Sequence, residues 1–263
     1  MGEIAAYLAI GAVVGFLAGL LGIGGGIVIV SSLALMFAAH AFPAAFVMHM
    51  AIATSLGAMV AGSFASLRTH HRHGAVDWHV VKLMTPGLLA GALAGTALSR
   101  HIPNAFLKYF FLGFTLFVTA QMTLDLKPRA VRDLPRGAGL AAAGAGIGVV
   151  SGLFGSGAAA IGVPFLTWCR MNTHRAIGTV AALAFPLALA GSAGYIWSGW
   201  GVEGLPPGSL GFVYLPALVG ISATSILFAP FGARLAHRLP AARLRKIFAL
   251  FLAAMAVKVA VSI

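Results

Sequence analysis

The hydrophobic positions of the chain fall into ten long segments separated by nine short polar interruptions. The segments cover residues 4–21, 27–39, 47–67, 81–99, 105–124, 138–154, 158–169, 176–197, 210–232 and 247–263. A helix needs about 20 residues to cross the ~30 Å hydrocarbon core of a bilayer. Most of the segments approach that length, but 27–39 and 158–169 are too short to cross alone. The pattern predicts an all-α polytopic membrane protein with five helical segments in each half.

The composition also favours membrane insertion. Hydrophobic residues make up 60% of the 263 residues and charged residues only 8%, against about 25% charged residues in soluble domains. The formal net charge is +12, but the Lys and Arg residues lie mostly in short loops, as the positive-inside rule explains. Nucleic acid is therefore not an expected partner. The first residues lack the basic region of a signal peptide, so the first apolar segment is expected to be retained.

A glycine-rich stretch occurs once in each half of the chain. At a shift of 133 residues, Gly15, Gly19, Gly22 and Gly24 fall on Gly148, Gly152, Gly155 and Gly157. Further along, residues 49–54 match residues 174–179. This order of matching blocks predicts two transmembrane repeats, at 1–125 and 138–263, joined by a cytoplasmic linker at 126–137. Paired glycine-interrupted segments of this kind are typical of the binding site of a transporter.

Each glycine-rich stretch has two interpretations: one broken span, or a hairpin that turns back at the glycines. Loop charge separates them. If the stretches are hairpins, the loops on one side of the membrane hold 14 Lys or Arg and the loops on the opposite side hold two. If they are single spans, the loops on the two sides hold seven and nine. The positive-inside rule therefore favours hairpins, with the basic side cytoplasmic. Each half then crosses an odd number of times, so the repeats are inverted and both termini are expected in the periplasm.

The glycines themselves support two different roles. Gly15, Gly19, Gly148 and Gly152 have the Gly-x-x-x-Gly spacing of close helix packing. The second group is too dense for packing alone, and it predicts turns that line a ligand: Gly22, Gly24, Gly25, Gly26, Gly155 and Gly157. Free backbone N–H groups at a helix start attract anions, and glycine lets a ligand approach the backbone closely.

Several polar residues near these turns are candidate ligands. The hydroxyls of Thr54, Ser55, Ser156 and Thr179 can donate to an anion without adding charge, although Ser and Thr hydroxyls in spans often bond to their own helix. His49 and His174 precede the two threonines by five residues. Either histidine could carry a proton or attract an anion, or simply cap a helix start at the membrane interface.

The acidic residues are informative by their positions. All five lie in loops or at a terminus, so none is predicted inside a span, where carboxylates usually bind cations or protons. An anion carrier is therefore favoured over a cation carrier. The tract from His70 to His73 is interpreted as a solvated loop, since no Cys or carboxylate completes a metal site. Cys169, the single cysteine, is interpreted as a packing residue. No metal and no cofactor are expected.

The run from Gly19 to Val30 (Gly-Leu-Leu-Gly-Ile-Gly-Gly-Gly-Ile-Val-Ile-Val), its second copy ending in Val163-Pro164, and the block at 174–179 resemble the TauE/SafE family of sulfite exporters. This family is also called the toluene-sulfonate uptake permease family. The resemblance implies transport of sulfite, a sulfonate or a related sulfur oxyanion across a bacterial inner membrane. The chain departs from the usual pattern at Ser31, where proline is frequent, and at Ala158 and Ala159, which replace glycines.

The residues and the resemblance together predict a secondary transporter, not an enzyme. It would export a small sulfur oxyanion by alternating access around a midplane site between the two hairpin tips. One alternative is a drug/metabolite-type carrier of another small organic solute. The other is an intramembrane serine hydrolase using Ser156 and a histidine. The expected partners are a small anionic substrate, membrane lipid and, as an option, a second copy in a homodimer.

Overall fold

A computed structural model describes residues 2–21, 25–40, 42–124, 132–156, 158–236 and 241–262. Helices dominate these residues: α1 Gly2–Leu21, α2 Gly26–Ala39, α3 Val47–Arg72, α4 Trp78–Ser99, α5 Asn104–Thr123, α6 Ala138–Phe154, α7 Ala159–Trp168, α8 Thr173–Ser198, α9 Leu215–Ala236 and α10 Ala241–Ser262. By length and composition, α3, α4, α5, α8 and the Leu215–Gly232 part of α9 can each cross a membrane. The predicted all-α polytopic membrane fold is confirmed.

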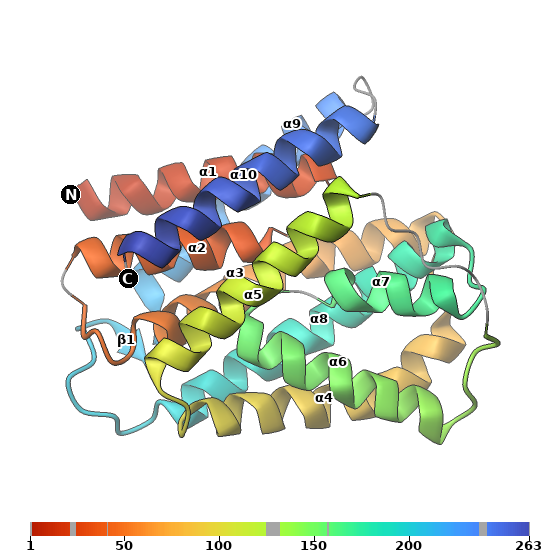
Figure 1. The fold of residues 1–263 in the computed structure, drawn as a ribbon, viewed down its shortest axis with the longest axis horizontal. Helices are drawn as coiled ribbons and strands as arrows, with labels where there is room; N and C mark the ends of the chain where they lie inside the picture. The colour runs from red at the N-terminus through yellow and green to blue at the C-terminus, as the bar shows by residue number, and fades with distance from the viewer. Residues whose placement is uncertain are drawn as a thin grey trace.

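The chain turns back after α1, as the loop charges predicted. Tyr7, near the start of α1, has its ring centroid 6.0 Å from that of Tyr214, and Phe42, just after α2, lies 5.2 Å from the same ring. The start of α1 and the end of α2 therefore lie together, at the end of the molecule that also holds both termini (Figure 1). We call this the terminal end, and the opposite one the linker end.

The second half forms an equivalent hairpin at the linker end. The backbone N–H of Arg132, six residues before α6, donates to the Trp168 carbonyl at the end of α7 (3.4 Å). The Arg132 guanidinium also lies over the Trp168 ring, 5.5 Å from its centroid. Arg170, just after α7, pairs with Asp133 at 3.2 Å. The start of α6 and the end of α7 therefore meet, so the hairpin interpretation holds in both halves and the single-span interpretation is wrong.

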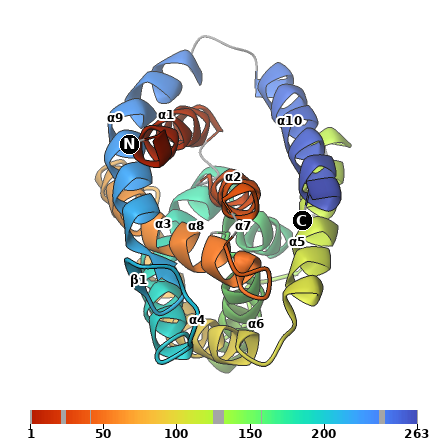
Figure 2. The same ribbon diagram turned by 90° about the vertical axis from the view of Figure 1, so that its left-hand side faces the viewer.

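The two halves pack into one another. The first helix of each half packs on the fourth helix of the other, as α1 does on α9 and α6 on α4. Two further pairs join the halves, α3 with α8 and α5 with α10. Figure 2 shows α2 and α7 enclosed by these pairs. Because one hydrophobic core contains residues of both halves, the glycine turns at the starts of α2 and α7 are held in the interior.

Glycines allow the helix pairs to approach closely. On α4, Gly87, Gly91 and Gly95 face the backbone of α6, and a Cβ at Gly95 would lie 2.7 Å from the Val149 carbonyl oxygen. On α6, Gly148 meets the Leu88 backbone, while Gly15 on α1 meets the Ser225 backbone. The packing interpretation of Gly15, Gly148 and Gly152 is confirmed. The surroundings of Gly19 lie outside the description of the structure.

The sequence pattern misplaced three local features. The segment expected to be helical from residue 210 starts as a two-stranded antiparallel hairpin, β1 Ser209–Leu210 and β2 Val213–Tyr214. Gly208 and Gly211, with φ of +87° and +56°, supply its turns. The tract from His70 to His73, interpreted as a solvated loop, lies in the last turn of α3 up to Arg72. A helix can continue beyond its apolar part because its polar side chains there reach water. Likewise, α10 begins at Ala241, before the apolar segment predicted from residue 247.

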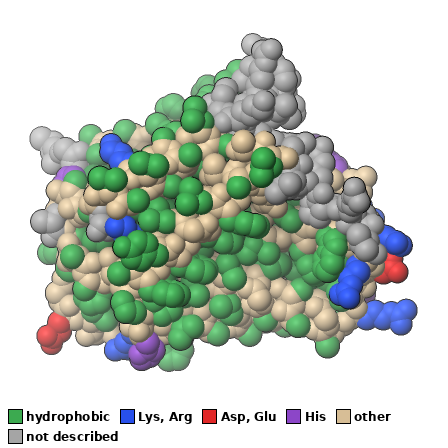
Figure 3. Space-filling model, viewed as in Figure 1, with side chains coloured by type: hydrophobic (Ala, Val, Ile, Leu, Met, Phe, Trp, Pro, Cys, Tyr) green, Lys and Arg blue, Asp and Glu red, His purple; other side chains and the backbone are tan. Residues whose placement is uncertain are grey.

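The surface fits a membrane environment. Figure 3 shows hydrophobic side chains across the visible face, with Lys and Arg near the two ends of the molecule. Large apolar side chains are exposed on helices, including Tyr109, Val219, Leu250 and Val261, each more than 60% exposed. An aqueous protein would not leave such a continuous apolar face uncovered, whereas lipid tails cover it without cost.

Candidate functional site

The two glycine turns touch in the interior of the molecule. We call Gly25 and Gly26 the first tip, and Gly155 and Ser156 the second tip. A Cβ added at Gly26 would lie 2.9 Å from the Ser156 Cα and 3.0 Å from the Gly155 carbonyl oxygen. Gly25 and Gly155 both have a left-handed backbone, with φ of +64° and +69°, which glycine adopts at little cost. The geometry therefore requires glycine at both tips.

Ser55 on α3 bridges the two tips. Its hydroxyl lies 3.1 Å from the Gly155 carbonyl oxygen and 3.3 Å from the Gly26 carbonyl oxygen, and it donates to this pair. The side chain is fully buried, and Ser156 beside it is only 3% exposed. A single hydroxyl proton shared by two acceptors binds each of them weakly, so the bridge can be exchanged when the tips separate.

The N-terminus of α2 lies at this contact, because Gly26 of the first tip is its first residue, whereas α7 begins at Ala159, three residues after the second tip. The carbonyl of Gly25 accepts the amide of Ile29, so the three amides from Gly26 to Val28 lie outside the hydrogen-bond ladder of α2. In the same way, Gly162 donates to Ala158, which leaves the amides of Ala159 to Ile161 outside the ladder of α7. The positive end of the α2 dipole therefore lies at the buried contact, where Gly155 ends α6, and no carboxylate is predicted in any span to oppose it.

Thr54 and Thr179 make matching contacts between the halves. The Thr54 hydroxyl on α3 accepts the amide of Tyr214, directly before α9, at 3.0 Å. The Thr179 hydroxyl on α8 accepts the amide of Asp77, directly before α4, at 2.9 Å. Each threonine therefore holds the start of a helix in the other sequence half. A role for these two hydroxyls as substrate ligands stays a prediction, because both already have a backbone partner here.

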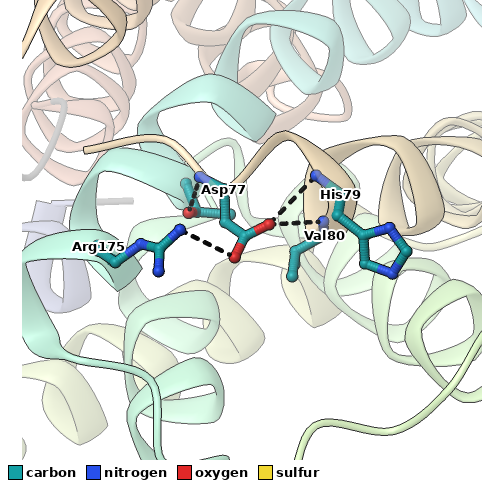
Figure 4. Close-up of polar contacts among 5 residues, drawn as sticks. Asp77, His79, Val80 and Arg175 are labelled. Atoms are coloured by element: carbon teal, nitrogen blue, oxygen red, sulfur yellow. Dashed lines mark hydrogen bonds and ion pairs between the residues drawn. The ribbon is translucent and has the colours of Figure 1, made fainter. Parts of the chain in front are cut away.

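Asp77 forms a polar cluster at the linker end that the sequence analysis did not single out (Figure 4). One carboxylate oxygen accepts the amides of His79 and Val80 at 3.2 Å and caps α4. The other lies 3.4 Å from the Arg175 guanidinium at the start of α8. An Asp directly before an apolar segment is an N-cap signal that can be recognised in the sequence. The sequence gives no sign that Asp77 pairs with Arg175, which is 98 residues away.

The two candidate histidines lie at opposite ends of the molecule and in different surroundings. His49 is 3% exposed, near the start of α3 at the terminal end, and its Nε2 lies 2.9 Å from the Ser99 carbonyl oxygen. His174 is exposed at the linker end, where its amide donates to the capping Asn172 side chain. His174 lies in the first turn of α8, but the residue that caps this helix is Asn172 and not the histidine. A role for either residue in moving a proton or an anion stays a prediction.

Three candidate site residues, Gly22, Gly24 and Gly157, lie outside the described residues. Within the described part of the chain, His, Cys, Asp and Glu form no group of three or more that could hold a metal ion. Cys169 is buried at the end of α7, and burial raises the pKa of its thiol, which makes it a poor nucleophile. It fits the packing role expected of it.

Comparison with known proteins identifies the family. The family model described as "Sulfite exporter TauE/SafE" matches residues 7–259, nearly the whole chain. The chain belongs to the TauE/SafE family. A relative named "Probable membrane transporter protein" from Haemophilus influenzae is 34% identical over 253 residues, which cover 95% of each chain. A second, "Probable membrane transporter protein YdhB" from Bacillus subtilis, is 29% identical over 71% of this chain and 76% of its own length.

Membership in TauE/SafE places the chain among membrane transporters. No solved structure matches it. The serine hydrolase alternative needs a base within hydrogen-bond reach of Ser156. In the described parts of the chain, no hydrogen bond joins Ser156 to a histidine, and His174 lies exposed at the linker end.

Proposed function

We propose that the protein exports a small sulfur oxyanion, such as sulfite or a sulfonate, through a site between the first and second tips. One observation supports this most directly: the N-terminus of α2 and two left-handed glycines meet at a buried contact that Ser55 bridges. Backbone amides of this kind bind an anion without a fixed positive charge, so the anion can also leave. The sulfite exporter description of the family supports the choice of substrate class.

The mechanism that fits this site is alternating access. The tips belong to hairpins that enter from the terminal end and from the linker end, and each half packs its first helix on the fourth helix of the other. We infer that the halves are inverted repeats that rock about the contact between α3 and α8. An anion would separate the tips and replace the Ser55 bridge with its own hydrogen bonds.

We also infer that the terminal end faces the periplasm and the linker end the cytoplasm of a bacterial inner membrane, since most Lys and Arg lie at the linker end. Two single-cysteine variants test this, both in a Cys169→Ala background: Glu203→Cys at the terminal end and His73→Cys at the linker end. A membrane-impermeant maleimide should label Glu203→Cys in intact cells, and His73→Cys only after permeabilisation. The reverse pattern of labelling would show the opposite orientation.

The substrate is tested by flux into liposomes that contain the purified protein. We expect sulfite to move down its gradient faster than in protein-free liposomes, and a sulfonate to compete with it. Chloride and a neutral amino acid serve as controls for leak and for a carrier of broader range. Flux of the amino acid without flux of any sulfur oxyanion would favour the drug/metabolite-type carrier instead.

A further inference from the structure

A second polar site lies at the terminal end, separate from the tips. It is a cavity of about 370 Å³ whose wall includes Phe46, His49, Arg100, His101 and Asn104. A cavity of this size holds a small oxyanion with its hydration water. His49 and Ser55 are six residues apart on α3, or about 9 Å along its axis, so the cavity lies on the same helix as the tip bridge.

Arg100 gives this cavity a positive charge that the topology does not explain. The linker end holds most of the chain's 17 Lys and Arg, in keeping with the positive-inside rule, whereas Arg100 follows α4 at the opposite end. Arg100 is exposed and has no carboxylate partner among the described residues. An unpaired guanidinium at a cavity wall is available to bind an anion with two parallel hydrogen bonds.

His49 lines the same cavity, and its ring carries a buried hydrogen-bond acceptor. Its Nε2 lies 2.9 Å from the Ser99 carbonyl oxygen. A carbonyl can only accept, so Nε2 carries the hydrogen and Nδ1 of the neutral ring is an acceptor. Nδ1 is buried without a hydrogen-bond partner among the described residues. A buried, unpaired acceptor is costly, so a donor that reaches Nδ1 would stabilise the site.

We infer that this cavity binds an oxyanion that carries one acidic proton, such as hydrogen sulfite, before or after it passes the tips. Arg100 pairs with the negative oxygens and the oxyanion's O–H donates to Nδ1 of His49. The rings of Phe46 and Phe212 pack on the imidazole, with centroids 6.1 and 5.2 Å from it. Phe46 also lines the cavity, and the inference includes a displacement of its ring that exposes the buried Nδ1 to the oxyanion. This inference rests on the proposed function, and it adds a second site and a preferred protonation state.

The charge contribution is tested with Arg100→Gln, and Lys108→Gln serves as a matched control. Lys108 lies at the same end, on α5, and does not line the cavity. We expect Arg100→Gln to raise the KM for sulfite flux roughly tenfold, the usual scale of one charge-assisted hydrogen bond, with little change in maximal rate. Lys108→Gln should leave the KM near wild type. Equal KM values for both variants and wild type would overturn the inference.

The acceptor role is tested with two substitutions of His49. A glutamine places its side-chain nitrogen near the position of Nε2 and keeps the bond to Ser99, whereas an asparagine places its amide group near Nδ1. Methanesulfonate has the same charge as hydrogen sulfite and also three oxygens on sulfur, but it has a methyl group and no acidic proton. We expect wild type and His49→Asn to prefer sulfite over methanesulfonate, and His49→Gln to lose that preference. An unchanged preference in His49→Gln would disprove the acceptor role.

Binding to the purified protein in detergent separates this inference from the proposed function. Calorimetric titration with sulfite should show binding that weakens in Arg100→Gln and not in Lys108→Gln. If wild type transports sulfite and Arg100→Gln matches it in both flux and binding, only the second site is wrong. If wild type binds sulfite through Arg100 but moves none, the proposed function fails and the site stands. If wild type neither transports nor binds sulfite, both the proposed function and the second site are overturned.

Discussion

Substitution of Gly26 by alanine should reduce sulfite flux roughly tenfold, because the added methyl group separates the two tips. The new Cβ would lie 2.9 Å from the Ser156 Cα and 3.0 Å from the Gly155 carbonyl oxygen, both backbone atoms of the second tip. Overpacking of this kind costs about 1–3 kcal/mol, and each ~1.4 kcal/mol lost from substrate binding is a factor of ten. The measurement is the initial rate of sulfite flux in liposomes.

The matched control for this substitution is Gly62→Ala on α3. A Cβ at Gly62 meets no atom within 4 Å, so this variant should transport like wild type. Ser55→Ala provides a second, milder comparison, since it removes the bridge but adds no atoms. It leaves two buried carbonyls without that donor, at a cost of about 1–3 kcal/mol. Wild-type flux in Gly26→Ala, with normal expression, would rule out a substrate site between the tips.

A leucine at Gly91 should have the largest effect on stability. Gly91 lies where α4 crosses α6, and even a Cβ there would collide with the Ala145 backbone. The helices would have to move apart along the whole contact that Gly87, Gly95 and Gly148 also form. We expect a loss of about 3 kcal/mol or more, enough to leave little folded protein, since native domains have only about 5–15 kcal/mol to lose.

The yield of monodisperse protein in size-exclusion chromatography and the melting temperature in detergent measure this effect. Gly146→Ala on α6 is the control, because a Cβ at Gly146 meets no atom within 4 Å. It should express and melt like wild type, with a small gain possible from the higher helix propensity of alanine. A Gly91→Leu protein as stable as Gly146→Ala would show that α4 and α6 tolerate a wider separation.

The chain path was predictable because the bilayer restricts it strongly. Backbone groups in lipid must be satisfied within helices, so long apolar segments become helices with few exceptions. Loop charge then separated hairpins from single spans, and the contacts of Tyr7 with Tyr214 and of Arg132 with Trp168 confirmed the hairpins. The short β hairpin before α9 was missed because its apolar residues continue the hydrophobic segment without a break in composition.

The site was only partly predictable. The sequence repeat identified the glycines and threonines by position, since a repeated unit must place equivalent residues in equivalent surroundings. It did not reveal the bridge, because Ser55 has no hydroxyl counterpart in the second half, where Val180 follows Thr179. The repeat also assigned His49 and His174 the same candidate role. In the structure, however, His49 is buried among aromatic rings and His174 is exposed.

The sequence by itself determined that the protein is a helical membrane protein with two glycine-broken hairpins, and its resemblance to the TauE/SafE family, which the family model confirms, indicated a transporter. The helical segments and the hairpins were predictable without that resemblance. Those features depend on composition, local spacing and loop charge, which act over one or two helical segments. Only the tertiary structure decided that the first and second tips touch, that Ser55 joins them, and that Arg100 and His49 share a cavity. Each of these contacts links residues 29 or more positions apart, so it depends on how the whole set of helices packs.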